Sequence, residues 1–154
     1  MRVALYQPDI PQNTGGILRL SACFRAPVHI IEPCGFVMDD ARLRRARLDY
    51  TAATSPVQHI SWSAFLSYVS SHSERLRLVL LTTHADRSYI DERFTKDDIL
   101  LLGRESSGVP QEVHAAVESR IKIPMGPGMR SLNVVTAAAI VLTEALRQTD
   151  GFPE

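Results

Sequence analysis

The stretch Ile121–Leu146, IKIPMGPGMRSLNVVTAAAIVLTEAL, decides the fold. Its first residues alternate apolar and polar side chains, which predicts a strand over 120–123. Pro124 ends that strand because proline has no N–H to donate to a sheet. The Gly-Pro-Gly at 126–128 predicts a turn with an open backbone. Ser131 is the expected N-cap of the helix that follows.

The predicted C-terminal helix is apolar on almost every side. One stripe consists of Leu132, Val135, Ala139, Leu142 and Leu146, and a second consists of Val134, Ala138, Val141 and Ala145. A helix that is apolar all round has to be buried all round. We therefore expect one stripe to cover a sheet and the other to meet a second subunit, which predicts a homodimer through this helix. A central core helix in a monomer is the alternative.

The bulk properties indicate one soluble globular domain. The chain has 154 residues, 45% of them hydrophobic and 22% charged, so a single domain over 1–154 with a frayed tail at 150–154 is expected. The formal net charge is zero, which argues against a large basic surface for nucleic acid but is compatible with a local basic patch.

Neither a membrane nor a metal is expected. There is no apolar run of 18 residues, and the start, MRVALYQPDIP, becomes polar too early for a signal peptide. Cys23 and Cys34 form no CxxC pair, which favours a cytoplasmic location, and Cys23 fits a core position better than a nucleophile. The five histidines are scattered without ligand spacing.

Strands and helices alternate along the chain. Expected strands cover 2–7, 28–31, 57–60, 76–82, 99–102 and 120–123, and expected helices cover 14–24, a segment after Asp39, the segment around 62–69, 109–117 and the C-terminal segment. This order predicts an α/β fold with a mostly parallel sheet and helices on both faces. Ligands of such sheets bind beyond the carboxyl ends of the strands. If the strands preceding them are neighbours, the loops at 80–83, 102–108 and 123–126 form one pocket.

Two of the loops carry candidate chemistry. In Gln12–Arg19, QNTGGILR, glycines lead into a helix N-terminus that can attract phosphate, and Arg19 lies about one turn inside. The segment 102–108, LGRESSG, opens its backbone at Gly103 and offers Glu105 as its carboxylate. An ordinary loop and a solvated turn are the alternatives, because neither segment matches a Walker loop or GxGxxG.

The densest basic run is Arg42, Arg44, Arg45 and Arg47. Guanidinium groups fit phosphate oxygens, so RNA binding is one interpretation of this run. Nearby aspartates offset its charge, so a solvated helix face is the other.

Three stretches together resemble the SPOUT class of RNA methyltransferases. They are Asn13–Arg19, Leu102–Gly108 and Ile123–Val134, and the resemblance extends over nearly the whole chain. The small size, IIEPCGF and DDARLRRARLDY are most similar to the small tRNA wobble-nucleotide 2′-O-methyltransferases. Arg47 departs from the glycine common in that pattern, and Thr143 replaces an aromatic residue found in some members.

This resemblance implies a C-terminal trefoil knot, a homodimer, and S-adenosylmethionine held in the knot loops. Its motif positions imply these cofactor contacts: Leu81, Thr82, Gly103, Gly108, Ile123, Met125, Ser131 and Leu132. They imply Arg19, Asn13 and Glu105 as catalytic residues, with Glu105 orienting Arg19. RNA contacts are expected from Arg19, Arg44, Arg45 and Arg130, in a site shared between subunits.

The implied reaction is direct, metal-free methyl transfer to the ribose 2′-hydroxyl of the wobble nucleotide, position 34, cytidine or uridine, of tRNA. Arginine is a poor base, so Arg19 is expected to hold phosphate or the developing alkoxide. Methylation of another RNA such as rRNA, and a catalytically silent RNA-binding dimer, are the alternatives.

Overall fold

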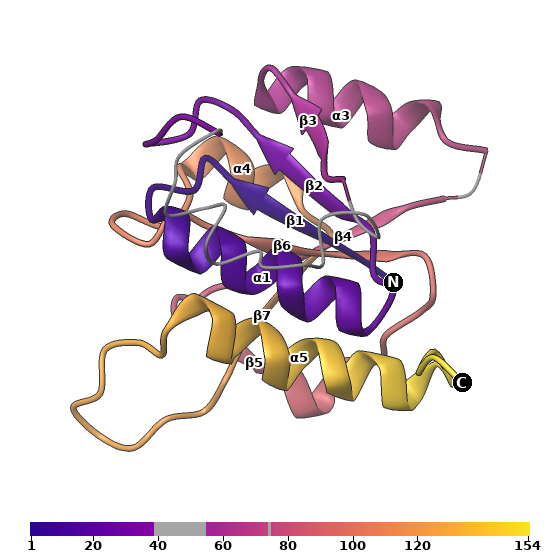
Figure 1. The fold of residues 1–154 in the computed structure, drawn as a ribbon. Helices are drawn as coiled ribbons and strands as arrows, with labels where there is room; N and C mark the ends of the chain where they lie inside the picture. The colour runs from indigo at the N-terminus through magenta and orange to yellow at the C-terminus, as the bar shows by residue number, and fades with distance from the viewer. Residues whose placement is uncertain (39–54, 74) are drawn as a thin grey trace.

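A computed structural model of the chain describes residues 1–38, 55–73 and 75–154 (Figure 1). The strands are β1 (Arg2–Tyr6), β2 (Val28–Ile31), β3 (Val57–His59), β4 (Arg77–Leu81), β5 (Arg87–Ser88), β6 (Asp98–Leu102) and β7 (Ser119–Lys122). The helices are α1 (Pro11–Cys23), α3 (Trp62–Ser71), the short 3-10 helix η2 (Tyr89–Asp91), α4 (Gln111–Ala116) and α5 (Val134–Gln148). The expected helix after Asp39, with Arg42, Arg44, Arg45 and Arg47, lies outside the described residues.

The seven strands form one sheet in the order β3-β2-β1-β6-β4-β7-β5, and every neighbouring pair is parallel. Leu100 at the centre of β6 lies opposite Val3 of β1 on one side and Val79 of β4 on the other. These strands are nearly continuous apolar runs because both faces of the sheet are covered. The predicted parallel α/β class is confirmed.

Two core clusters show which helices cover each face. Ile17 of α1 and Val141 of α5 belong to one cluster, and Phe65 of α3 and Val113 of α4 belong to the other. Helices α1 and α5 therefore cover one face while α3 and α4 cover the opposite face (Figure 1). The expectation of helices on both faces is confirmed.

Helix α1 begins at Pro11, three residues before the predicted start at Thr14. Proline suits the first turn because its missing N–H would have no intrahelical partner there. The glycines of QNTGG consequently lie within the helix rather than in a loop before it. A Cβ at Gly16 would lie 2.9 Å from Val135 Cγ2, so this glycine lets α1 approach α5 closely. Cys23 is exposed, and its expected place in the core is wrong.

Helix α5 begins at Val134, and its N-cap is Asn133 rather than the predicted Ser131. Asn133 Oδ1 accepts the N–H groups of Val135 (2.9 Å) and Thr136 (3.4 Å), so the first turn is satisfied without Ser131. Ser131 and Leu132 are exposed in the loop before the helix. The buried face takes residues from both predicted stripes: Ala138, Val141, Leu142, Ala145 and Leu146.

The predicted bounds of β2 are exact and the other boundaries differ by at most three residues, whereas the sequence did not predict β5 or η2. Both are short polar segments without a periodic pattern. The tail after α5 contacts the body of the protein, since Gly151 N–H donates to Leu146 O at 2.9 Å and the Phe152 ring meets Phe24 edge to face.

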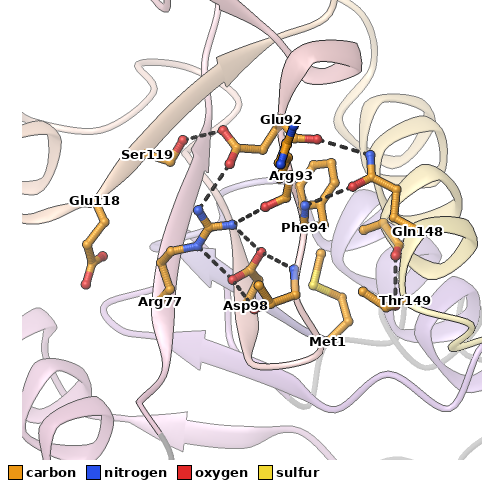
Figure 2. A network of polar contacts seen from close by, with 12 residues as sticks. Met1, Arg77, Glu92, Arg93, Phe94, Asp98, Glu118, Ser119, Gln148 and Thr149 are labelled. Carbon is orange, nitrogen blue, oxygen red and sulfur yellow. Dashed lines mark hydrogen bonds and ion pairs between the residues drawn. The ribbon is translucent and has the colours of Figure 1, made fainter.

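A buried ion network fixes the amino ends of three strands against the end of α5 (Figure 2). Arg77 at the start of β4 donates to Asp98 of β6 at 2.6 Å and to Glu92 at 3.1 Å. Glu92 also accepts the Ser119 hydroxyl of β7, and its backbone oxygen accepts the Gln148 amide of α5 at 3.1 Å. Glu92 and Asp98 are almost fully buried, so their charges depend on these partners. This end of the sheet is opposite to the loops that follow the strands.

Candidate functional site

The loops after β4, β6 and β7 meet at one edge of the sheet. Strand β4 lies between β6 and β7, so the carboxyl ends of all three are adjacent. Thr82 N–H donates to Ile121 O at 2.9 Å, which joins the end of β4 to β7. A cavity of about 1020 Å³ lies between these loops and the first turns of α1 and α5. The predicted pocket of converging loops is therefore present.

All eight residues predicted to contact a cofactor line this cavity. They are Leu81, Thr82, Gly103, Gly108, Ile123, Met125, Ser131 and Leu132. They come from three segments far apart in the chain, which the sheet order brings together. Their geometry suits a ligand site, and their contact with a cofactor stays a prediction.

The loop 103–108 closes on itself. Arg104 and Gly108 exchange two backbone hydrogen bonds, of 3.0 and 2.9 Å. A Cβ at Gly103 would lie 2.8 Å from the Gly108 carbonyl carbon, and Gly108 has φ +67°, a conformation that favours glycine. Both glycines are needed for this tight loop, which presents backbone to the cavity.

Asn13 joins the three motifs. Its Nδ2 donates to Glu105 Oε1 at 3.2 Å, and its Oδ1 accepts Asn133 Nδ2 at 3.0 Å. The three side chains come from α1, the loop after β6 and the cap of α5. Asn13, Glu105 and Asn133, which we call the amide bridge, line the cavity. The hydrogen bond from Asn13 shows that Glu105 orients Asn13. Orientation of Arg19 by Glu105 stays a prediction.

Asp9 is a site residue that the sequence reasoning missed. Asp9 and Glu105 exchange bonds, because each carboxylate accepts the backbone N–H of the other residue, at 3.0 and 3.2 Å. Asp9 also accepts the Ser106 hydroxyl, and Arg104 Nε lies 3.6 Å from Asp9 Oδ2. The sequence feature that could have identified Asp9 is its position in the turn-rich loop directly after β1, a strand that neighbours β6 in the sheet.

The pKa values of the Asp9 and Glu105 carboxyl groups are shifted in opposite directions. The neighbouring Glu105 side chain and hydrogen bonds from Ser106 lower the pKa of Asp9 to about 2. Burial raises the pKa of Glu105, and the adjacent Asp9 raises it further. Asp9 therefore stays ionised to lower pH, and Glu105 is the member that takes up a proton more readily.

Two of the predicted arginines, Arg19 and Arg130, are not among the residues that line the cavity. Arg19 is an exposed residue of α1, six positions after Asn13. Arg130 is exposed in the loop between β7 and α5. Arg44 and Arg45 lie outside the described residues. The structure thus brings Asn13 and Glu105 together, whereas Arg19 lies further along α1 and outside the cavity lining.

Several polar lining residues were not predicted, among them His84, Asp86, His114 and Arg120. No motif marks them, and only their positions at the ends of β4 and α4 and in β7 point to the cavity. Within residues 1–38, 55–73 and 75–154, no cluster of three or more His, Cys, Asp or Glu side chains could hold a metal ion. None of the described helices is long and apolar enough to cross a membrane.

Comparison with known proteins places the fold and site in a family. Residues 1–143 match the model of the SpoU rRNA Methylase family. The chain belongs to this family. The resemblance to SPOUT-class methyltransferases, drawn from three motifs, is thereby confirmed.

Relatives in this family are similar over almost their whole length. The tRNA (cytidine(34)-2'-O)-methyltransferase of Beijerinckia indica is 53% identical over 146 residues, covering 95% of this chain and 90% of the relative. The Escherichia coli K12 protein of the same name is 41% identical, covering 99% and 96%.

Solved structures of methyltransferases have the same fold as this chain. A structure described as "Structural insights into the 2-OH methylation of C/U34 on tRNA" superposes with a TM-score of 0.89 at 38% identity, covering 96% of this chain and 94% of the other. The SpoU methyltransferase AviRb of Streptomyces viridochromogenes, in complex with AdoMet, has a TM-score of 0.89 at 25% identity, covering 96% and 60%.

Proposed function

We propose that this protein transfers a methyl group from S-adenosylmethionine to the ribose 2′-hydroxyl of the wobble nucleotide, position 34, of tRNA, with cytidine or uridine as the base. The observation that carries the proposal is sequence similarity over nearly the whole chain to two proteins named for this reaction, at 53% and 41% identity. The cavity supports it, because the motifs predicted to bind the donor meet there.

The cavity residues fit S-adenosylmethionine. Its volume of about 1020 Å³ is at the upper end of cofactor-sized sites. Leu81, Ile123 and Leu132 offer apolar surface, and the loop at Gly103 offers backbone groups. When bound there, the sulfonium of the cofactor supplies an electrophilic methyl group, and no metal is required. A Cβ at position 103 would not fit against Gly108.

The amide bridge holds the reacting groups in place. Asn13, Glu105 and Asn133 fix α1, the loop after β6 and the start of α5 relative to one another. Orientation of this kind accounts for a large share of the rate in a direct transfer. The raised pKa of Glu105 suits it to share in removal of the hydroxyl proton, with solvent as the final acceptor.

Arg19 meets the RNA in a site shared by two subunits. Arg19 lies six residues after Asn13, about 9 Å further along α1, and outside the cavity lining of the same protomer. A dimer formed through α5 can place Arg19 at the cavity of the partner subunit. There its guanidinium holds a phosphate or the developing alkoxide. Arg44, Arg45 and Arg130 add phosphate contacts.

The remaining parts of the proposal follow from the family. The C-terminal segment from β7 through α5 forms a trefoil knot, residues 1–154 form one domain, and the protein is a cytoplasmic homodimer.

Methyl transfer to defined RNAs tests the reaction. The protein is incubated with labelled S-adenosylmethionine and either tRNA or rRNA, and 2′-O-methyl groups are mapped by nucleotide. Label at position 34 of tRNA is expected. Label confined to rRNA would move the substrate to the RNA in the family's name. RNA binding without label in either substrate would indicate a silent dimer.

Arg19→Ala tests the assignment of the arginine. We expect methylation to fall at least about 100-fold while cofactor affinity stays the same, because a guanidinium acting only on RNA is removed. Arg75→Ala is the matched control, since Arg75 is also exposed but precedes β4, at the other end of the sheet. Equal methylation by the Arg19 and Arg75 variants would reject the role.

A further inference from the structure

Three basic side chains from different elements line one part of the cavity. His84 follows β4, His114 lies in α4, and Arg120 lies in β7. We call these three residues the basic rim. None of them belongs to the three motifs that indicate the donor site, and the proposed methyl transfer leaves them without a role.

Ring contacts and hydrogen bonds hold the basic rim together. The rings of His84 and His114 meet edge to face, with centroids 6.5 Å apart. Arg120 Nη1 donates to the backbone oxygen of His114 at 2.7 Å, and His84 N–H donates to Thr82 Oγ1 at 3.2 Å. Arg120 forms no ion pair in the part of the chain that the structure describes, so most of its donors remain available to a ligand.

The basic rim and the amide bridge belong to opposite faces of the sheet. Asn13 and Asn133 come with α1 and α5, whereas His114 comes with α4 on the other face. The cavity lies at the sheet edge and reaches both. Asp86, two residues after His84, also lines the cavity, so this side offers a carboxylate as well as the Arg120 guanidinium.

We propose that the basic rim, with Asp86, binds the amino-acid end of the methyl donor. This inference rests on the proposed function. S-adenosylmethionine has one carboxylate and one ammonium group, both at that end of the molecule. If the methyl group faces the amide bridge, the amino-acid end extends away from it. Arg120 and the two histidines then receive the carboxylate, and Asp86 receives the ammonium group.

The solvent exposure of the basic-rim side chains determines how much they contribute to ligand affinity. Arg120 and His84 are exposed, so water screens their interaction with a carboxylate. A charged hydrogen bond of this kind contributes about tenfold in affinity when one partner is removed. Removal of a basic-rim side chain should not change the affinity contributed by the adenosine part of the ligand, which the motif loops hold.

Two thioether ligands test the proposal by calorimetry. S-adenosylhomocysteine carries the amino-acid end, and 5′-methylthioadenosine lacks it. Arg120→Ala should weaken S-adenosylhomocysteine about tenfold and leave 5′-methylthioadenosine unchanged. Arg120→Lys should restore most of the affinity because it keeps the charge. Arg75→Ala is the control for loss of an exposed arginine, and His84→Ala is a second variant if Arg120→Ala does not fold.

The outcomes are distinct. Equal weakening of both ligands, or of neither, overturns the proposal. Weakened tRNA binding with unchanged S-adenosylhomocysteine affinity also overturns it and makes the basic rim an RNA contact. If the unaltered protein binds neither thioether, the proposed function itself fails, separately from the inference about the basic rim.

Discussion

Asn13 uses both ends of its side-chain amide. The nitrogen donates to Glu105 and the oxygen accepts from Asn133, so one residue satisfies a partially buried carboxylate and holds the residue that caps α5. An amide is suited to this position because it offers a donor on one side and an acceptor on the other. A carboxylate would have no donor for Glu105, and alanine would have neither group.

Asn13→Ala should reduce methyl transfer more than it reduces cofactor affinity. Losing both bonds frees the loop after β6 and the start of α5 to move apart, and small displacements of reacting groups cost up to about 100-fold in rate. Single-turnover methylation and calorimetry with S-adenosylhomocysteine measure the two effects. Gln12→Ala, at the exposed neighbouring position, is the control. A full rate in the Asn13 variant would contradict the bridging role.

Gly103→Ala should abolish cofactor binding. The added Cβ would lie 2.8 Å from the Gly108 backbone, so the loop 103–108 has to open. Gly126→Ala is a matched change in the loop after β7, where no atom lies within 4 Å of the added Cβ. Calorimetry should show no binding to the first variant and nearly full binding to the second. Normal affinity after Gly103→Ala would mean that the loop tolerates a wider form.

At the scale of elements, the edge formed by β2, β3 and α3 contains a buried histidine pair. His29 Nδ1 lies 3.0 Å from His59 Nε2, and both rings pack against Phe65 and Tyr68 of α3. Burial, together with the charges of His59, Arg2 and His72, lowers the pKa of His29 to about 4. Burial also lowers the pKa of His59. The pair therefore favours the neutral form of both rings.

Folding stability should fall as the pH decreases through this range. The ordinary pKa of histidine is near 6.5, so the unfolded chain takes up a proton below that pH while folded His29 does not until about pH 4. The loss begins near pH 6.5, ends near pH 4, and amounts to about 3 kcal/mol for His29. Urea unfolding across this range measures it. His29→Gln should flatten the dependence, whereas His84→Gln should retain it; an identical slope in both variants would exclude the pair as its source.

The elements themselves were largely predictable, and their ends were not. Continuous apolar runs such as 76–82 and 99–102 can only be buried strands in a chain of this class, and both are present. The predicted cap of α5 was Ser131, but the observed cap is Asn133, whose side chain is also held by the tertiary hydrogen bond to Asn13. No local pattern contains a contact between residues 120 positions apart.

At the scale of the whole molecule, the rule that loops after parallel strands converge located the cavity from sequence. The same rule could not place Arg19, because its position relative to the cavity depends on where α1 begins. Asp9 and the basic rim were missed for a related reason, since their role comes from the sheet order β1-β6-β4-β7. The order of neighbouring strands is a property of the assembled sheet rather than of any segment.

The proposed dimer can be tested at adjacent residues of α5. Val141 is fully buried in the core of one protomer, although the sequence assigned it to a stripe that could meet a partner. Ile140 lies two residues from buried Ala138, about 200° around the helix, and so faces away from that core. An apolar side chain on the outward face of α5 is the better interface residue.

Ile140→Glu should therefore give folded monomers, whereas Val141→Glu should unfold the protein, because an unpaired charge is tolerated at a wet surface but not in a core. Sedimentation measures the oligomeric state, and circular dichroism measures the fold. Ser70→Glu, on exposed α3, is the control for an added surface charge. Methylation should disappear along with the dimer if Arg19 serves the cavity of the partner. If the Ile140 variant is monomeric and fully active, the proposed interface is supported and the proposed shared site is rejected. If the variant stays dimeric, this face of α5 is not the interface.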